Sequence, residues 1–250
     1  MKRILIVLMV VAILTSTIFT TTAGAVTVND EQQEENPYLF EYEDREYIVT
    51  PISLNREPRV SSSGYVEKYT EVPHFFQTFY PDVMYGNTSV RQGGCGITCV
   101  AMVFTYLLDE EIKVEDLASK YFRYKEKDGS SYSLFQDSAK DYGIEVSGPI
   151  YDWEVVKEAL EDGHVIIANP RKPSIFTEGG HFIVLSGLTE DNKIIVKDPN
   201  LYNYSIWNYD VREEGYANGF EEKYIKSCIP CWIYEIKDIE KVATQQYETE

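Results

Sequence analysis

The stretch Gly-Gly-Cys-Gly-Ile-Thr-Cys-Val-Ala-Met-Val, residues 93–103, decides how this chain of 250 residues is interpreted. Cys95 stands between glycines at the start of an apolar segment whose spacing predicts a helix over Cys95–Leu108. A helix N-terminus carries partial positive charge and free N–H groups, so it favours a thiolate and can hold an oxyanion. A lone cysteine is often only a small buried side chain. The flanking glycines, which we expect to leave the backbone open to a substrate, favour a nucleophile instead.

A histidine and an acid follow Cys95 in chain order. Of the three histidines, His74 lies in an aromatic segment and His164 follows a predicted helix end, and we interpret both as structural or exposed. His181 follows two glycines and precedes an apolar strand, so its imidazole can act as a base at the sheet edge. Asp198 ends the next strand, and the hairpin returns it toward His181, where a carboxylate would orient the imidazole. An ordinary Asp-Pro turn is the alternative for Asp198.

The order of the predicted elements indicates an α+β domain. Apolar spacing predicts helices at Cys95–Leu108, Val114–Tyr124, Tyr132–Tyr142 and Trp153–Leu160. Strands are predicted at Ile144–Val146, His164–Ala168, His181–Ser186, Lys193–Lys197 and Trp232–Ile236. No internal repeat is found. We therefore expect N-terminal helices packed on an antiparallel sheet.

Composition divides the chain into four segments. Residues 1–25 have a basic start, a short apolar run and small residues at the end, which is typical of a secretory signal peptide. Residues 26–64 are polar and acidic, and we predict an acidic linker or a removable pro-segment in which Tyr47–Thr50 forms a short strand. Residues 65–237 form the domain, and residues 238–250 form a polar tail. The apolar run is too short for a membrane span, so we expect a secreted, soluble mature protein without stable membrane insertion.

The net charge of the chain excludes one class of partner. The sequence has 23 Lys and Arg against 41 Asp and Glu, which gives a formal charge of −18 at pH 7. Such a surface repels nucleic acid. We interpret the acids as a solvated surface that keeps an exported protein dispersed. Attraction to cationic peptides or cationic surfaces is the alternative, and the spacing of the acids does not single it out.

Four motifs carry a resemblance to a known family: Val72–Gln77, Gly94–Met102, Gly180–Gly187 and Asp198–Asn200. They resemble the papain-like cysteine peptidases related to the double-glycine leader peptidases that process bacteriocin precursors, in their stand-alone secreted form. The resemblance covers roughly residues 65 to 236. It implies a papain-like fold with Cys95 as nucleophile, His181 as base and Asp198 as the orienting acid. It also implies Gln77 as the side-chain donor to the oxyanion.

The chain departs from the family pattern in two places. In leader-processing members the glutamine stands closer to the cysteine, whereas Gln77 lies well before Cys95 and Gln92 lies only three residues before it. We prefer Gln77 and keep Gln92 as the alternative. Ile97 stands where the family often has proline, and Cys99 is also unusual. Neither change touches the proposed chemistry.

The pair Cys228 and Cys231 has several interpretations. In an exported chain a Cys-x-x-Cys pair can be a disulfide, a redox pair or part of a metal site with Cys95 and Cys99. A four-cysteine zinc site would leave His181 without a role. We therefore expect a local disulfide or two reduced structural thiols, and no cofactor or metal.

These observations together predict a secreted cysteine peptidase that hydrolyses a peptide or protein substrate through an acyl-enzyme. A cell-wall amidase and an acyl transferase with the same triad are alternatives within the enzyme class. A catalytically inactive peptide-binding module is the alternative outside it, and the complete Cys-His-Asp set argues against it. The fold alone does not name a substrate.

Overall fold

The computed structural model describes residues 39–42, 45–48, 71–127, 129–200 and 209–235. The chain divides into two compact units, residues 1–51 and 52–250. In the first unit, β1 (Leu39–Tyr42) and β2 (Arg45–Ile48) form an antiparallel hairpin, and β2 overlaps the predicted strand Tyr47–Thr50. The predicted signal peptide at 1–25, most of the predicted linker at 26–64 and the predicted tail at 238–250 lie outside the described residues.

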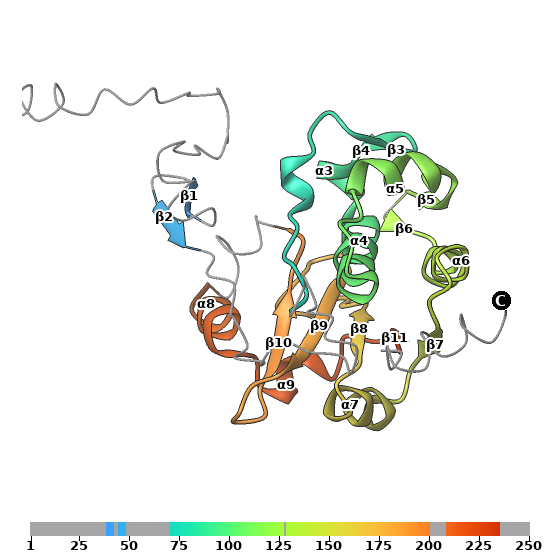
Figure 1. Ribbon diagram of the computed structural model, residues 1–250. Helices are drawn as coiled ribbons and strands as arrows, with labels where there is room; N and C mark the ends of the chain where they lie inside the picture. The colour runs from blue at the N-terminus through green and yellow to red at the C-terminus, as the bar shows by residue number, and fades with distance from the viewer. Residues whose placement is uncertain (1–38, 43–44, 49–70, 128, 201–208, 236–250) are drawn as a thin grey trace, which may run out of the picture. The chain divides into compact units, whose positions relative to one another are not determined.

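The second unit is built on a five-stranded antiparallel sheet. The strand labels run across Figure 1 in the order in which the strands pair: β10 (Ile194–Lys197), β9 (Ile183–Leu188), β8 (Val165–Ala168), β11 (Cys231–Tyr234) and β7 (Val146–Ile150). Every residue of β8, β10 and β11 is buried. Side chains alternate between the two faces of a strand, so the three strands need a cover on both faces.

Helices supply that cover and create two separate cores. The α4-side core contains α4 (Cys95–Leu108), α5 (Val114–Lys120) and α6 (Ser133–Asp141), packed on the face that carries Val165 and Ile167. The α7-side core contains α7 (Trp153–Glu161), α8 (Tyr209–Asn218) and α9 (Glu222–Ile225), packed on the face with Ile166 and Ala168. Figure 1 shows α4 above the row of strands and α7 and α9 below it.

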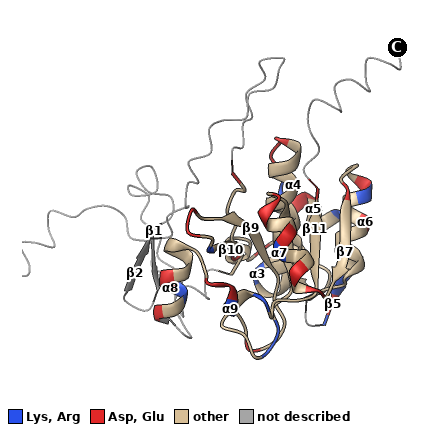
Figure 2. Cartoon of the chain, turned by 90° about the horizontal axis from the view of Figure 1, so that it is seen from below, with Lys and Arg blue, Asp and Glu red and all other residues tan. Residues whose placement is uncertain are grey.

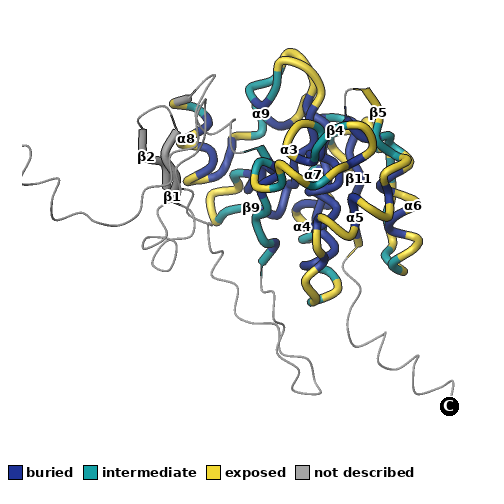
Figure 3. Tube along the Cα trace, turned by 90° about the horizontal axis from the view of Figure 1, so that it is seen from above, coloured by how far each residue is buried: buried dark blue, intermediate teal, exposed yellow. Residues whose placement is uncertain are grey.

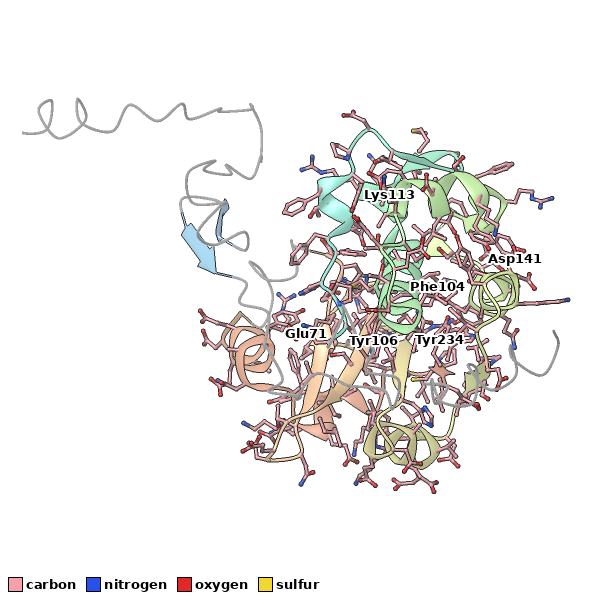
Figure 4. All side chains as sticks on the ribbon, in the orientation of Figure 1. Glu71, Phe104, Tyr106, Lys113, Asp141 and Tyr234 are labelled. Atoms are coloured by element: carbon pink, nitrogen blue, oxygen red, sulfur yellow. The ribbon has the colours of Figure 1, made fainter. Side chains whose placement is uncertain are left out.

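Helix α4 is the central helix of the unit. All residues from Cys95 to Tyr106 are buried, and α4 is accordingly dark blue in Figure 3. Phe104 packs against Tyr142 and against Tyr234 at the end of β11, with ring centroids 5.1 and 6.1 Å apart (Figure 4). Because the helix is enclosed on all sides, the position of its first residue, Cys95, is fixed by the core.

The predicted α+β class is confirmed, and so is the helix at Cys95–Leu108. The predicted helix over Val114–Tyr124 is instead two elements, α5 and the 3₁₀ helix η2 (Phe122–Tyr124). The predicted strand Ile144–Val146 begins only at Val146, because the N–H of Ile144 donates to the carbonyl of Ala139 and so belongs to the end of α6. Helices α8 and α9 were not predicted.

Short elements connect the larger ones: η1 (Gln77–Phe79), β3 (Met84–Tyr85), β4 (Thr88–Ser89), α3 (Val90–Gly93), β5 (Lys125–Glu126) and β6 (Gly129–Ser130). Strands β3 and β4 pair with each other, as do β5 and β6. Within the described part of the chain, no helix has the length and apolar character that a membrane span requires.

Candidate active site

Cys95 is the first residue of α4, and Gly94 is its N-cap. Helix α3 ends directly before it, where the N–H of Gly94 donates to the carbonyl of Val90 at 2.7 Å. The first bond inside α4 runs from the N–H of Thr98 to the carbonyl of Gly94 at 2.9 Å. The N–H groups of an initial helical turn have no partner within the helix, so their partial positive charge lies at the end of α4 where Cys95 stands. The side chain is 7% exposed.

The glycines beside Cys95 have a packing role that the sequence did not predict. A Cβ at Gly96 would lie 2.7 Å from Oγ and 2.9 Å from Cβ of Ser130, and one at Gly94 would lie 2.5 Å from a methyl carbon of Val90. The expectation that these glycines leave the backbone open to a substrate is therefore wrong, because the chain itself fills that space. Glycine is needed here so that β6 and α3 can approach the start of α4.

His181 lies two residues before β9, and its backbone is held on both sides. Its N–H donates to the carbonyl of Pro170 at 3.2 Å, and its carbonyl accepts a hydrogen bond from the amide Nδ2 of Asn169 at 2.6 Å. Its side chain, 6% exposed, has Nε2 only 2.7 Å from Oδ1 of the fully buried Asp198. Because Nε2 of His181 is bonded to Asp198, Nδ1 is the ring nitrogen that remains to interact with Cys95.

Asp198 follows β10 and accepts hydrogen bonds at both carboxylate oxygens. Besides His181, Oδ1 accepts the N–H of Asn200 at 2.8 Å, and Oδ2 accepts the hydroxyl of Tyr216 at 2.7 Å. Burial alone raises the pKa of Asp198, but the charge of His181 and the three hydrogen bonds hold it below its ordinary value. The carboxylate is therefore ionised at neutral pH.

The surroundings of His181 favour its protonated form. Burial lowers the pKa of His181, but the charge and hydrogen bond of Asp198, together with a hydrogen bond to Cys95, outweigh burial and raise that pKa to about 10. An imidazolium next to a thiol at a helix N-terminus favours the thiolate. The three predicted residues Cys95, His181 and Asp198 are thus brought together in one place, from the start of α4, the start of β9 and the end of β10.

Gln77 and Gln92 differ in burial. Gln77 is buried in η1, its backbone N–H donates to the carbonyl of Pro199 at 2.8 Å, and its side-chain Nε2 donates to the carbonyl of Arg91 at 3.0 Å. An amide nitrogen carries two protons, so Nε2 keeps one for another acceptor. Gln92 is exposed. Gln77 is thus anchored on the residues just before Cys95, and its role as oxyanion donor stays a prediction.

Two residues that the sequence analysis did not assign to the site touch Asp198. One is Tyr216 of α8, which lies in a segment where no helix was predicted. The other is His74, whose Nε2–H donates to the main-chain carbonyl of Asp198 at 2.7 Å. Burial and the charge of Lys197 lower the pKa of His74 to about 3, so the ring is neutral and acts as a donor. Lys197 is itself buried, 3.9 Å from the carboxylate of Glu71, which is labelled in Figure 4. In the sequence, only the position of His74 in the Val72–Gln77 motif could have indicated that His74 contacts Asp198.

The four cysteines are all free thiols, and they lie in two different places. Cys95 and Cys99 belong to the α4-side core, and Cys228 and Cys231 belong to the α7-side core. The thiol of Cys231 donates to the carbonyl of Cys228 at 3.2 Å. Among the residues that the structure describes, no three His, Cys, Asp or Glu side chains are grouped so as to hold a metal ion.

A cavity of about 710 Å³ opens beside His181. One wall comes from β5, β6 and the residues that follow, and the other comes from the loop between β8 and β9. Its lining comprises Glu126, Lys127, Gly129, Ser130, Ser131, Tyr132, Asn169, Arg171, Lys172, Gly179, Gly180, His181 and Phe182. A chain segment bound there would lie next to the imidazole.

A model of the Peptidase_C39 like family matches residues 69–227, which is more than half of the chain. The chain therefore belongs to this family, and its membership supports a cysteine-type peptidase. The matched residues include Cys95, His181 and Asp198. No curated protein was found that matches the chain.

Proposed function

We propose that the protein is a peptidase that cleaves peptide bonds through a covalent acyl-enzyme, with Cys95, His181 and Asp198 as its triad. The single observation that carries this proposal is the contact of 2.7 Å between His181 and Asp198 next to a thiol at the start of α4. Membership of a peptidase family supports the same chemistry.

The proposed reaction begins from a thiolate on Cys95 and an imidazolium on His181. The sulfur attacks the carbonyl carbon of the scissile amide, and the first N–H groups of α4 with the side-chain amide of Gln77 stabilise the oxyanion. The C–N bond breaks as His181 gives its proton to the leaving amine, and a thioester remains on Cys95. His181 then takes a proton from water, the resulting hydroxide attacks the thioester, and cleavage of the C–S bond releases the carboxylic acid.

The mechanism is tested by a matched pair of substitutions on one helix. Cys95 and Cys99 both lie on α4, but Cys99 is fully buried, and burial raises the pKa of its thiol well above the ordinary value. Cys95→Ala should abolish hydrolysis of a synthetic peptide library, measured by mass spectrometry, whereas Cys99→Ala should retain it. Iodoacetamide at pH 6 should label Cys95 faster than the other three cysteines, and His181→Ala should slow that labelling. Hydrolysis by Cys95→Ala would end the proposal.

The same assay distinguishes the alternative functions. A cell-wall amidase would release fragments from purified peptidoglycan and leave the peptide library intact. An acyl transferase would join a library peptide to an added primary amine instead of hydrolysing it. An inactive binding module would give no product with any of these substrates and an unreactive Cys95.

We also propose that the protein is exported, because residues 1–25 have the layout of a signal peptide. Mass spectrometry of the culture supernatant should find a mature N-terminus at or near Val26. Full-length protein that stays in the cytoplasm would contradict export without affecting the proposed chemistry.

A further inference from the structure

The cavity beside His181 has a charge opposite to that of the whole chain. Among the residues that the structure describes, its lining contains, besides His181 itself, the cationic residues Lys127, Arg171 and Lys172 and the acid Glu126, whereas the chain has a net charge of −18. Lys172 is paired with Glu178 through a contact of 3.1 Å, and both side chains are exposed. Arg171 is the cation of the cavity whose guanidinium is held in place by contacts with Asn169 and Tyr132.

A buried asparagine ties Arg171 to the site. The Nε–H of Arg171 donates to Oδ1 of Asn169 at 2.9 Å, and the same oxygen accepts the hydroxyl of Tyr132 at 2.8 Å. Nδ2 of Asn169 donates to the carbonyl of His181 at 2.6 Å, and the Asn169 side chain is 3% exposed. One asparagine therefore fixes the guanidinium relative to the backbone of His181.

The guanidinium is also oriented from a second direction. Its carbon lies 5.6 Å from the centre of the Tyr132 ring, a cation–π contact across the cavity wall. Arg171 pairs with Gly180 in an isolated β-bridge, which fixes its backbone next to the loop that leads to His181. A guanidinium that is held at Nε and stacked on an aromatic ring is preorganised. Binding a ligand through the Nη groups of Arg171 therefore costs little side-chain entropy.

The two Nη groups are available for a ligand. Among the described residues they have no hydrogen-bond or ion-pair partner within the chain. The planar fork of arginine matches a carboxylate, which it binds through two parallel hydrogen bonds. A peptide that passes His181 with an acidic side chain in the cavity would place that carboxylate against Arg171.

We propose that this cavity binds an acidic side chain, Asp or Glu, of the peptide substrate and that Arg171 is the residue that selects it. The inference rests on the proposed peptidase function and deepens it by naming the substrate class. Asn169 and Tyr132 position the guanidinium, and Arg171 makes the contact with the substrate.

The test uses the full-length protein and matched peptides. Cleavage of the synthetic library first gives the preferred residue at each position near the scissile bond, and two peptides are then made that differ only by Glu or Gln at the position with the strongest acidic preference. The wild type should cleave the Glu peptide with a kcat/KM about tenfold or more above that of the Gln peptide, since a hydrogen bond to a charged group is worth that much. Arg171→Gln should bring the ratio close to one, and Arg171→Glu should reverse it in favour of the Gln peptide.

Controls separate failure of this inference from failure of the proposed function. Arg123→Gln removes an exposed arginine outside the cavity lining and should keep the Glu preference. Iodoacetamide labelling of Cys95 in Arg171→Gln shows that the variant is folded. A library cleaved without acidic preference, or a preference that survives Arg171→Gln, overturns the inference and leaves the peptidase intact. If nothing is cleaved, the peptidase proposal falls. Fluorescence anisotropy with labelled library peptides that contain Glu, each compared with its Gln counterpart, then tests the cavity alone, and equal binding within every such pair overturns the cavity inference as well.

Discussion

At the scale of single residues, Asp198 is the most heavily bonded side chain of the site. Its Oδ1 faces His181 and the N–H of Asn200, its Oδ2 faces Tyr216, and its carbonyl accepts from His74. A carboxylate with these donors keeps its charge although it is fully buried. In the proposed mechanism this charge stabilises the imidazolium of His181, and the imidazolium favours a thiolate on Cys95. We therefore propose that Tyr216 and His74 are positioning residues, which act on Cys95 only through Asp198 and His181.

Replacing Tyr216 with phenylalanine tests that role. Tyr216→Phe removes the hydroxyl at 2.7 Å from Asp198 but keeps the ring, which packs on Phe176 and Phe220. The hydrogen bond lowers the pKa of Asp198, so its loss should raise that pKa and move the acid limb of the kcat/KM profile to higher pH. We also expect kcat/KM at neutral pH to fall about tenfold, as for a lost hydrogen bond to a charged group.

The control for this substitution is Tyr224→Phe, on the neighbouring helix α9, which is not among the residues in contact with Asp198. Its pH profile should coincide with that of the wild type. An unchanged acid limb in Tyr216→Phe, or an equal shift in both variants, would show that the Tyr216 hydroxyl has only a structural role.

At the scale of elements, the sequence predicted those with a regular apolar period. Helix α4 was found with the right bounds because its apolar residues recur after Gly96 without an interrupting Gly or Pro. The hairpin of β9 and β10 was found because its strands are apolar and a turn separates them. That prediction also brought His181 and Asp198 together. Helix α8 has no such period: its buried side is formed by Arg212, Gly215 and Tyr216.

Contacts made far along the chain could not be predicted from local pattern. Gly215 interrupts the helical propensity of α8, yet a Cβ there would lie 2.2 Å from the ring of Phe220, so the packing of that ring requires glycine. The bonds from Asn169 to His181 and from His74 to Asp198 likewise depend on how the loops meet in space. The type of residue at Asn169 gave no signal, since Asn is common in turns and loops.

The pair Cys228 and Cys231 lies where the chain passes from α9 to β11: Cys228 follows α9, and Cys231 is the first residue of β11. Both side chains are fully buried in the α7-side core, and burial raises the pKa of the Cys228 thiol to about 12. Replacing both with alanine should lower the free energy of unfolding by about 1–3 kcal/mol, as for other small buried truncations, when measured by urea denaturation. The folded variant should keep its turnover, because neither thiol belongs to the proposed triad. A folded variant that has lost turnover by orders of magnitude would place the pair in the active site.

At the scale of the whole molecule, an acidic surface surrounds a locally basic cavity. Figure 2 shows Asp and Glu spread over α5, α7 and α8, on the outer helices of both cores. The cavity beside His181 has instead the cations Arg171, Lys172 and Lys127. Charges at a distance are screened within about 8 Å at physiological salt, whereas a direct contact with a carboxylate is screened much less. The overall charge therefore sets long-range repulsion, and in the proposed function the local cations select which peptide is accepted.

The pH dependence of stability follows from two histidines with opposite shifts. The pKa of His74 is lowered to about 3, so between pH 3 and the unfolded value near 6.5 the unfolded chain binds more protons, and stability falls as the pH falls through this range. The pKa of His181 is raised to about 10, so between pH 6.5 and 10 the imidazole of His181 binds more protons in the folded state than in the unfolded state, and the contribution of His181 to stability falls as the pH rises. Together the two histidines predict a maximum in the free energy of unfolding near pH 6.5.

Urea denaturation of three proteins between pH 4 and 9 tests this dependence. His74→Gln keeps a side-chain N–H for the Asp198 carbonyl but cannot take up a proton. The free energy of unfolding should therefore fall less steeply below pH 6.5, and above pH 6.5 it should depend on pH as in the wild type. His181→Gln should have the opposite effect: the free energy of unfolding should fall less steeply above pH 6.5 and should depend on pH below 6.5 much as in the wild type. If the free energy of unfolding of His74→Gln falls toward low pH as steeply as that of the wild type, His74 is protonated in the folded protein. It then does not donate from a neutral ring to Asp198. If the free energy of unfolding of His181→Gln falls toward high pH as steeply as that of the wild type, the folded state does not stabilise an imidazolium at His181, and the proposed ion pair with Cys95 is not formed.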